Sequence, residues 1–224
     1  MERLLQSVKI AINDKVFLKD PDSSELGKRI IEHSILLIDE IGFEGFTFKK
    51  LGERIGSNES SIYRYFENKH KLLVYLTSWY WGWLEYQLVF ATNSIADAEE
   101  KLRQAISIVS KTTVEDHSYR HINEVLLNKI VVNESSKSFL TKEVDEENKQ
   151  GYFVIYKRMV GRMEEMIKAV APGYPYASSL ASTILEGTLH QHFLMDHFPS
   201  LTSCTLNNPP CNFIHDLVFK VLKS

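Results

Sequence analysis

The feature that most constrains this fold is a helical period that begins near Asp22 and continues almost to the last residue. Apolar residues recur every three or four positions, and Gly, Ser, Asn or Pro separates one such segment from the next. The prolines between residues 172 and 210 lie at these boundaries, where proline is tolerated. With Asp22 or Ser23 as the first N-cap, we expect helices over 23–41, 48–55, 59–66 and 69–90, and near 94–115, 119–133, 143–170, 175–197 and 209–223. The sequence therefore predicts an all-α chain.

Residues 1–22 do not share this period. Val8, Ile10 and Ile12 alternate with Lys9 and Ala11, and the segment then reaches Asn13-Asp14. Alternation of this kind around an Asn-Asp turn is typical of a β-hairpin. The alternative is a partly ordered N-terminal arm. We expect one of these two structures ahead of the helices.

The charge balance limits which partners the whole surface can attract. The chain has 26 Lys and Arg residues against 29 Asp and Glu residues, a net charge of −3. Proteins that coat nucleic acid nonspecifically are usually strongly basic, so DNA binding here needs a local basic patch. Two cysteines are too few for a disulfide framework or an all-cysteine zinc site. Since no secretory signal begins the sequence, we expect a cytoplasmic protein.

The most apolar stretch, residues 72–91, is long enough to span a bilayer. It contains Glu85, however, and a charge near the bilayer centre costs about 2.5–3.5 kcal/mol. We therefore expect a helix buried in protein and no membrane partner. No Gly-rich phosphate loop and no metalloprotease or serine-hydrolase motif is present, so we expect neither an enzyme nor a cofactor or metal site.

Residues 46–73 have the spacing of a helix-turn-helix motif. Thr47 and Asn58 can each N-cap a short helix, and Gly56 is placed to end the first one in a left-handed conformation. Two short helices joined by a three- or four-residue turn cross steeply. Gly52 lies inside the first helix, where glycine costs about 1 kcal/mol relative to alanine, and it permits close approach of the second helix.

The same region carries a positive charge. Residues 46–75 hold six Lys and Arg residues and three acidic ones, a local charge of +3. A modest basic patch on an acidic chain is typical of a protein that touches DNA at one end only.

The block Ile62-Tyr63-Arg64-Tyr65-Phe66, followed by Asn68-Lys69 and Leu72-Leu73, resembles the L-Y-R-H-F…K…L-L signature of the TetR family of bacterial repressors. Phe46-Thr47 and the turn at Gly56 fall at matching distances, and the resemblance covers about residues 24–75. It implies a three-helix DNA-binding domain over 23–68 and a larger helical domain over 69–224 that binds an effector and dimerises.

The resemblance also implies roles for individual residues. Those expected to contact DNA phosphates are Thr47, Tyr63, Tyr65 and Lys69. Those expected on or near the major-groove face are Asn58, Glu59, Ser60, Ser61 and Arg64. The alternative is that the two tyrosines only complete a small core. The chain departs from the family at Ser57, Asn58 and Ser60, where Val, Ser or Thr, and Gly are usual.

Two stripes at helical spacing follow in the second domain. Their members are either core residues or the lining of an effector pocket, and as pocket candidates we take Trp79, Trp83, Tyr86, Tyr152, Tyr156, Met159 and Met163. Such a lining suits an apolar or aromatic effector of unknown identity.

The segment near 175–197 carries the remaining candidates. By resemblance it belongs to a two-fold bundle, and the residues expected at the homodimer interface are Ser182, Ile184, Gly187 and His190. Glu186, His190 and His197 share one face, but three such residues on one helix are weak evidence for a metal. We therefore expect a homodimeric transcriptional regulator, most simply a repressor released from operator DNA by a small molecule. The rival is an all-α enzyme or carrier with a hydrophobic pocket.

Overall fold

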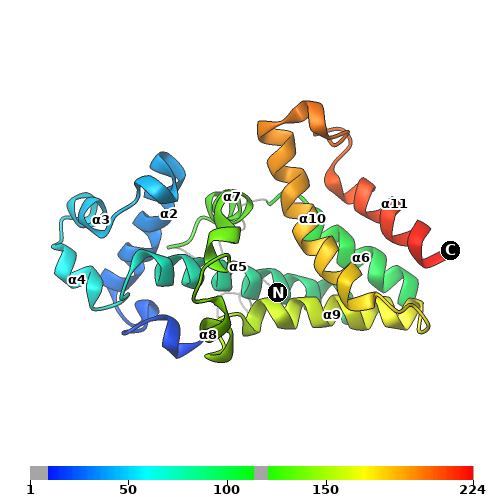
Figure 1. Cartoon of the computed structure of the whole chain (residues 1–224), viewed down its shortest axis with the longest axis horizontal. Helices are drawn as coiled ribbons and strands as arrows, with labels where there is room; N and C mark the ends of the chain where they lie inside the picture. Colours follow the sequence, from blue (N-terminus) through cyan, green and yellow to red (C-terminus); the bar gives the residue numbers. More distant parts are fainter. Residues whose placement is uncertain (1–9, 114–120, 224) are drawn as a thin grey trace. The chain divides into compact units, whose positions relative to one another are not determined.

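The computed structural model describes residues 10–113 and 121–223. In this part of the chain all regular structure is helical, and no β-strand forms (Figure 1). The α-helices are α2 (Glu25–Gly45), α3 (Phe48–Ile55), α4 (Glu59–Tyr63), α5 (Lys69–Thr92), α6 (Ala98–Ser110), α7 (Glu124–Glu134), α8 (Val144–Lys149), α9 (Val154–Val170), α10 (Ala177–His197) and α11 (Pro210–Lys223). Short 3₁₀ turns lie at Asp14–Val16, Pro21–Ser23, Ser135–Ser138 and Pro199–Leu201. The predicted all-α class is confirmed.

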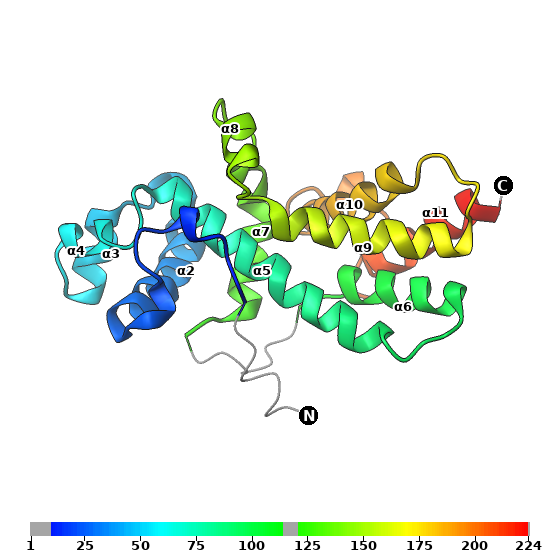
Figure 2. The same ribbon diagram turned by 90° about the horizontal axis from the view of Figure 1, so that it is seen from below.

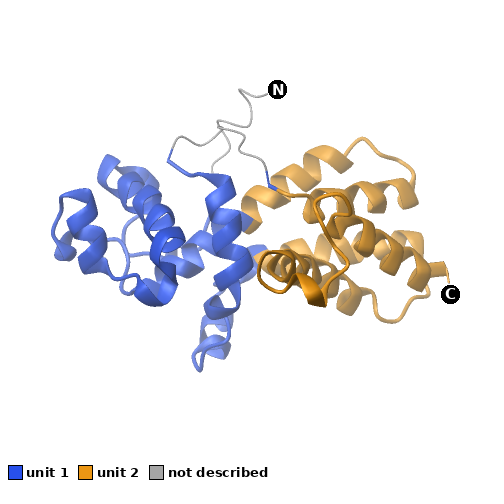
Figure 3. Ribbon diagram, turned by 90° about the horizontal axis from the view of Figure 1, so that it is seen from above, with its two compact units in different colours: residues 1–80, 113–155 blue, residues 81–112, 156–224 orange. Residues whose placement is uncertain are grey.

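The chain forms two compact units, and neither is one continuous stretch of sequence (Figure 3). Unit 1 comprises residues 1–80 and 113–155, and unit 2 comprises residues 81–112 and 156–224. This division differs from the expected boundary between residues 68 and 69. Helix α5 supplies its first half to unit 1 and its second half to unit 2.

The N-terminal β-hairpin is wrong for the residues that the structure describes, and Val8 and Lys9 lie outside them. Asn13 accepts a hydrogen bond from the Lys15 backbone and starts a 3₁₀ turn instead of a hairpin turn. The following residues pair with unit 1: the backbone N–H of Leu18 donates to the Tyr65 carbonyl at 2.7 Å. The buried side chain of Val16 anchors the segment. Residues 10–22 are therefore an ordered arm.

Several helix ends differ from those expected, because a different residue caps each helix. Ser24, and not Asp22 or Ser23, caps α2. Asp97 and Asn123 cap α6 and α7, so these helices begin later than expected; residues 119 and 120 lie outside the described part. The helix expected over 143–170 is interrupted at Gly151, whose φ of +85° separates α8 from α9.

Unit 2 holds the second half of α5 together with α6, α9, α10 and α11 (Figures 1 and 2). Helix α6 packs against α10 and α11. The buried hydroxyls of Ser110 and Thr188 are hydrogen-bonded at 3.1 Å, which joins α6 to α10. None of the described helices has both the length and the hydrophobicity that a membrane span needs.

Candidate nucleic-acid interface

Helices α3 and α4 of unit 1 form the predicted helix-turn-helix. The Thr47 hydroxyl accepts from the Lys50 N–H at 3.2 Å and caps α3, and the Asn58 side chain accepts from the Ser61 N–H at 2.8 Å and caps α4. Gly56 ends α3 in the left-handed region, with φ of +62°. These three features follow the sequence prediction, although α4 ends at Tyr63 and not at Phe66.

Gly52 determines how closely the turn approaches α3. A Cβ atom at this position would lie 2.8 Å from the Ser57 carbonyl oxygen and 3.3 Å from the Glu59 backbone nitrogen. Since both neighbours are backbone atoms, they cannot rotate away as a flexible side chain would. The glycine thus allows the tight crossing of the two helices, as predicted.

A small apolar core holds the motif together. The buried side chains of this core are Phe48, Leu51, Ile55, Ile62 and Phe66. The ring of Tyr63 packs edge-on against Phe48, with centroids 5.0 Å apart, yet 46% of Tyr63 remains exposed. The Tyr63 ring therefore belongs partly to the core, whereas much of its surface stays available to a partner.

The outer face of the motif is polar and exposed. The exposed side chains include Thr47, Lys49, Lys50, Asn58, Ser60 and Arg64. Among the residues that the structure describes, the Arg64 guanidinium has no hydrogen-bond or ion-pair partner, whereas Arg54 is paired with Glu40 at 2.5 Å. Glu59 and Ser61 are half-buried at the start of α4, and the Ser61 hydroxyl donates to Asn58.

Tyr65 and Lys69 lie differently from simple phosphate contacts. Tyr65 is buried, and its hydroxyl forms a 2.7 Å hydrogen bond with the Ser24 hydroxyl at the start of α2. The Lys69 ammonium donates to the carbonyls of Phe43, Glu44 and Phe46, at 3.0, 3.3 and 3.4 Å. Both side chains tie the motif to its neighbouring segments.

The residues expected to line an effector pocket fall into both units. Trp79 and Tyr152 belong to unit 1, and the others belong to unit 2. Of the set, all are buried except Tyr86 and Tyr156, which are half-buried. Burial, together with a 2.7 Å hydrogen bond from its hydroxyl to Glu186, raises the pKa of Tyr156 well above its ordinary value. In unit 2, none of these residues lines the cavity among α5, α6 and α9 or the cavity between α10 and α11.

The polar face of α10 has other partners than a metal. Glu186 accepts the hydrogen bond of Tyr156, and the rings of His190 and His197 lie 6.5 and 4.7 Å from the Phe193 ring. Among the described residues, no group of three or more His, Cys, Asp or Glu side chains is arranged to hold a metal ion.

The residues expected at a dimer interface differ in how deeply they are buried. Ile184 is fully buried inside unit 2, so it is a core residue of one chain and not a surface seam. Gly187 faces α11 of the same chain, since a Cβ there would lie 3.9 Å from the Ile214 side chain. Ser182 is half-buried and His190 is exposed. On α11, Phe213 is a large apolar residue that is 44% exposed.

Comparison with known proteins finds a family whose sequences resemble this helix-turn-helix region. Residues 30–76 match the family model of bacterial regulatory proteins of the tetR family. No curated protein sequence matches the chain.

Solved structures share the fold over most of the chain. AibR in complex with isovaleryl coenzyme A and operator DNA has a TM-score of 0.56 and 19% identity, covering 86% of this chain and 96% of that one. PfmR, a TetR family transcriptional regulator from Thermus thermophilus, has a TM-score of 0.55 and 16% identity, with coverages of 86% and 97%. The superantigen PfiT has a TM-score of 0.59 and 18% identity, with coverages of 92% and 100%.

At such identities the likeness shows the fold, and a fold that also occurs in a superantigen does not fix function by itself. The motif is more specific. The family match spans the described helix-turn-helix, with its two caps, its left-handed glycine and its exposed polar face. Residues 30–76 of this chain therefore carry a DNA-binding motif of the kind found in bacterial regulatory proteins of the tetR family.

Proposed function

We propose that this chain is a repressor that binds a two-fold operator as a homodimer and leaves it when a small molecule binds. The observation that carries the proposal is the exposed polar face of α3 and α4 within a family-matched motif. The AibR structure, which holds both isovaleryl coenzyme A and operator DNA, supports a ligand response on this fold.

On this proposal the exposed side chains divide the work of recognition. Thr47 and Tyr63 contact phosphates and set the register of the motif on DNA. Arg64, with five donors and no partner among the described residues, is the candidate for a base edge or an adjacent phosphate. Asn58, Glu59, Ser60 and Ser61 lie at the start of α4, the end of a recognition helix that reaches base edges.

Tyr65 and Lys69 position the exposed polar face of α3 and α4 and do not contact DNA themselves. The hydroxyl of Tyr65 holds the end of the motif to α2, and Lys69 holds the three carbonyls at the end of α2. Each therefore fixes the angle at which the motif is presented, because α2 is the helix against which α3 packs.

The dimer we propose uses the exposed surfaces of α10 and α11, with His190 and Phe213 in the seam and Ile184 in the core behind it. A two-fold protein matches a two-fold operator, because half-sites one turn of DNA apart need two motifs about 34–36 Å apart.

A gel-shift titration with the DNA upstream of the protein's own gene tests the proposal. We expect saturable binding that weakens steeply with salt. If Arg64 contacts a base edge, Arg64→Ala should cost about 1–3 kcal/mol of DNA-binding free energy. If Arg64 contacts a phosphate, the same substitution should reduce the slope of log affinity against log salt concentration by about one unit. Lys142→Ala, which removes an exposed charge from another segment of unit 1, is the matched control. Equal affinity of wild type and folded Arg64→Ala would remove Arg64 from the interface, and no binding to any upstream fragment would contradict the function.

A further inference from the structure

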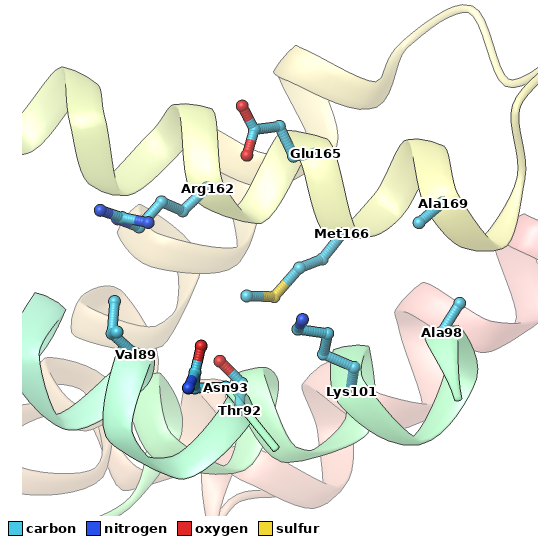
Figure 4. A pocket seen from close by; sticks show the side chains of 9 residues that line it. All are labelled: Val89, Thr92, Asn93, Ala98, Lys101, Arg162, Glu165, Met166 and Ala169. Carbon is cyan, nitrogen blue, oxygen red and sulfur yellow. The ribbon is translucent and has the colours of Figure 1, made fainter. Parts of the chain in front are cut away.

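Unit 2 contains a cavity of about 240 Å³ where the end of α5 meets α6 and α9 (Figure 4). Its lining residues are Val89, Thr92, Asn93, Ala98, Lys101, Arg162, Glu165, Met166 and Ala169. Small-molecule sites typically combine apolar walls with a few convergent polar groups and measure about 300–1,000 Å³. The cavity therefore suits a ligand smaller than a drug-sized molecule.

Two cations line this cavity from opposite helices. Lys101 extends from α6 toward Met166, and the guanidinium of Arg162 on α9 lies farther along the same space, across from Val89 (Figure 4). Within the described part of the chain, Lys101 has no ion pair. The Nε of Arg162 donates to Glu85 at 2.6 Å, and its two terminal amino groups have no partner among the described residues. Three N–H groups of Lys101 and four of Arg162 are thus available to an anion.

The nearby carboxylates do not neutralise these cations. Glu85 is buried and is shared by two arginines, since Arg158 also binds it through Nε at 2.7 Å. Burial would raise the pKa of the Glu85 carboxyl, but the hydrogen bonds and charges of Arg158 and Arg162 hold it below its ordinary value. One carboxylate between two guanidinium groups leaves one positive charge.

The other acids near the cavity are directed elsewhere. Glu165 is exposed, and its carboxylate points away from the other lining side chains (Figure 4). At the start of α6, Asp97 accepts the Glu100 backbone N–H at 2.8 Å, and Glu99 pairs with Arg103 at 2.5 Å. The cavity consequently keeps the positive charge of Lys101 in addition to that of the Glu85 cluster.

The rest of the lining is apolar. Val89 and Ala98 form part of the wall, and the flexible thioether of Met166 extends into the cavity (Figure 4). We propose that this cavity binds the effector, and that the effector is a small organic anion with a carboxylate or phosphate head and a short apolar chain. This assignment rests on the proposed repressor function, and it proposes an anionic head group in place of the apolar or aromatic effector expected beside Trp79 and Trp83.

Calorimetric titration of the full chain with three six-carbon probes tests the charge assignment. Hexanoate and monohexyl phosphate carry the two anionic heads, and hexanamide carries neither charge. We expect at least one anion to bind with hexanamide about 10-fold or more weaker, since hydrogen bonds to charged groups are the strong ones. Which anion binds tighter identifies the head group.

Two variants locate the site. Lys101→Met and Arg162→Met should each weaken anion binding about 10-fold or more; Glu85 keeps Arg158 in the second variant. Lys168→Met is the control, because Lys168 lies on α9 outside the lining and is exposed. Unchanged anion affinity in Lys101→Met, equal binding of hexanamide, or no saturable heat from either anion at about 10 mM would each overturn the proposal.

Gel shifts with the same samples separate this inference from the repressor function. We expect the bound anion to release wild-type protein from operator DNA, and Lys101→Met to stay bound at the same anion concentration. Calorimetric binding without release overturns the effector assignment. If the protein binds no operator, the repressor function fails while calorimetry still decides whether the cavity takes an anion.

Discussion

At the scale of single residues, the two glycines inside helices α3 and α9 make opposite demands. A Cβ on Gly52 meets backbone atoms at 2.8 and 3.3 Å, whereas a Cβ on Gly161 meets nothing within 4 Å. Alanine gains about 1 kcal/mol of helix propensity over glycine at either site. Only at Gly52 does overpacking, which typically costs about 1–3 kcal/mol, oppose that gain.

We therefore predict that Gly161→Ala raises the free energy of unfolding by about 0.5–1 kcal/mol. Gly52→Ala should lower it and should also weaken operator binding, because the turn must move away from α3. Urea denaturation of both variants checks this. A Gly52→Ala protein as stable as Gly161→Ala would show that the turn has room to yield.

The two tyrosines of the motif provide a second matched pair. Tyr65→Phe removes a 2.7 Å hydrogen bond between a buried residue and Ser24, and should cost about 1 kcal/mol of stability. Tyr63→Phe removes the hydroxyl of an exposed residue, so it should leave stability unchanged and weaken DNA binding without changing its salt dependence, because a neutral hydroxyl releases no counterion. Thermal denaturation and gel shifts together distinguish the two. The reverse pattern would restore Tyr65 as the direct contact.

At this scale the sequence was a good guide where one residue acts on its own backbone. Thr47, Asn58 and Gly56 cap or end helices through local geometry, which residue type and spacing predict. The burial of Tyr65 was not predictable in the same way. Its hydroxyl finds Ser24, 41 residues earlier in the chain, and no local pattern encodes that contact.

At the scale of elements, helices α10 and α11 each press a histidine against α6. His192 lies within 3.3 Å of the Ser110 carbonyl, and the His215 ring nitrogen lies 3.0 Å from the Ser107 hydroxyl. Burial lowers the pKa of His192 below its ordinary value of 6.5, against the opposing hydrogen bond to Ser110 and the charge of Asp196. Burial and the nearby Arg103 likewise lower the pKa of His215.

The lowered pKa values of these two histidines determine how the stability of the fold changes with pH. Below pH 6.5 the unfolded chain takes up protons on these histidines while the folded chain resists, so stability is present above this pH and is lost as pH falls. We predict that the thermal midpoint falls between about pH 7.5 and about pH 5.5. His192→Gln should flatten this fall. A fall of equal size in wild type and His192→Gln would exclude His192 as its source.

Helix boundaries show why element-level prediction was only partly correct. The periodic pattern over 143–170 reads as one helix, but Gly151 adopts φ of +85° and the chain breaks there. The amide of Asn13 donates to the Gln150 carbonyl at 2.9 Å beside this break. This contact from the N-terminal arm, 137 residues away in sequence, lies where α8 ends. Helix propensity alone does not predict that end.

At the scale of the whole molecule, the dimer depends on which apolar residues remain on the surface. Phe213 is 44% exposed, so a charge there is compatible with a folded chain, whereas a charge at the fully buried Ile184 is not. We predict that Phe213→Glu gives a folded monomer with reduced operator affinity, as seen by sedimentation. Leu140→Glu, a substitution of another exposed apolar residue, should remain dimeric. A dimeric Phe213→Glu protein would place the seam elsewhere.

The cavity of unit 2 could not be predicted from the sequence, because the residues that line it come from helices far apart in the chain. Lys101 and Arg162 are 61 positions apart and occupy polar positions of two amphipathic helices, which a sequence pattern assigns to solvent. Only the folded chain brings them to one space. By contrast, the helix-turn-helix lies within fewer than 30 consecutive residues, and its prediction needed no long-range contact.

The interrupted sequence of unit 1 has a consequence for synthesis. The ribosome delivers residues in order, yet unit 1 is not complete until residue 155, because its second segment follows the insertion of residues 81–112. The backbone N–H of Phe43 donates to Glu134, and His70 pairs with Glu147 at 2.7 Å. Both contacts can form only after these two acidic residues have been translated. The DNA-binding motif is made early, but the structure around it closes only after more than two thirds of the chain has been translated. A nascent chain therefore cannot hold a finished unit 1 before most of the regulator exists.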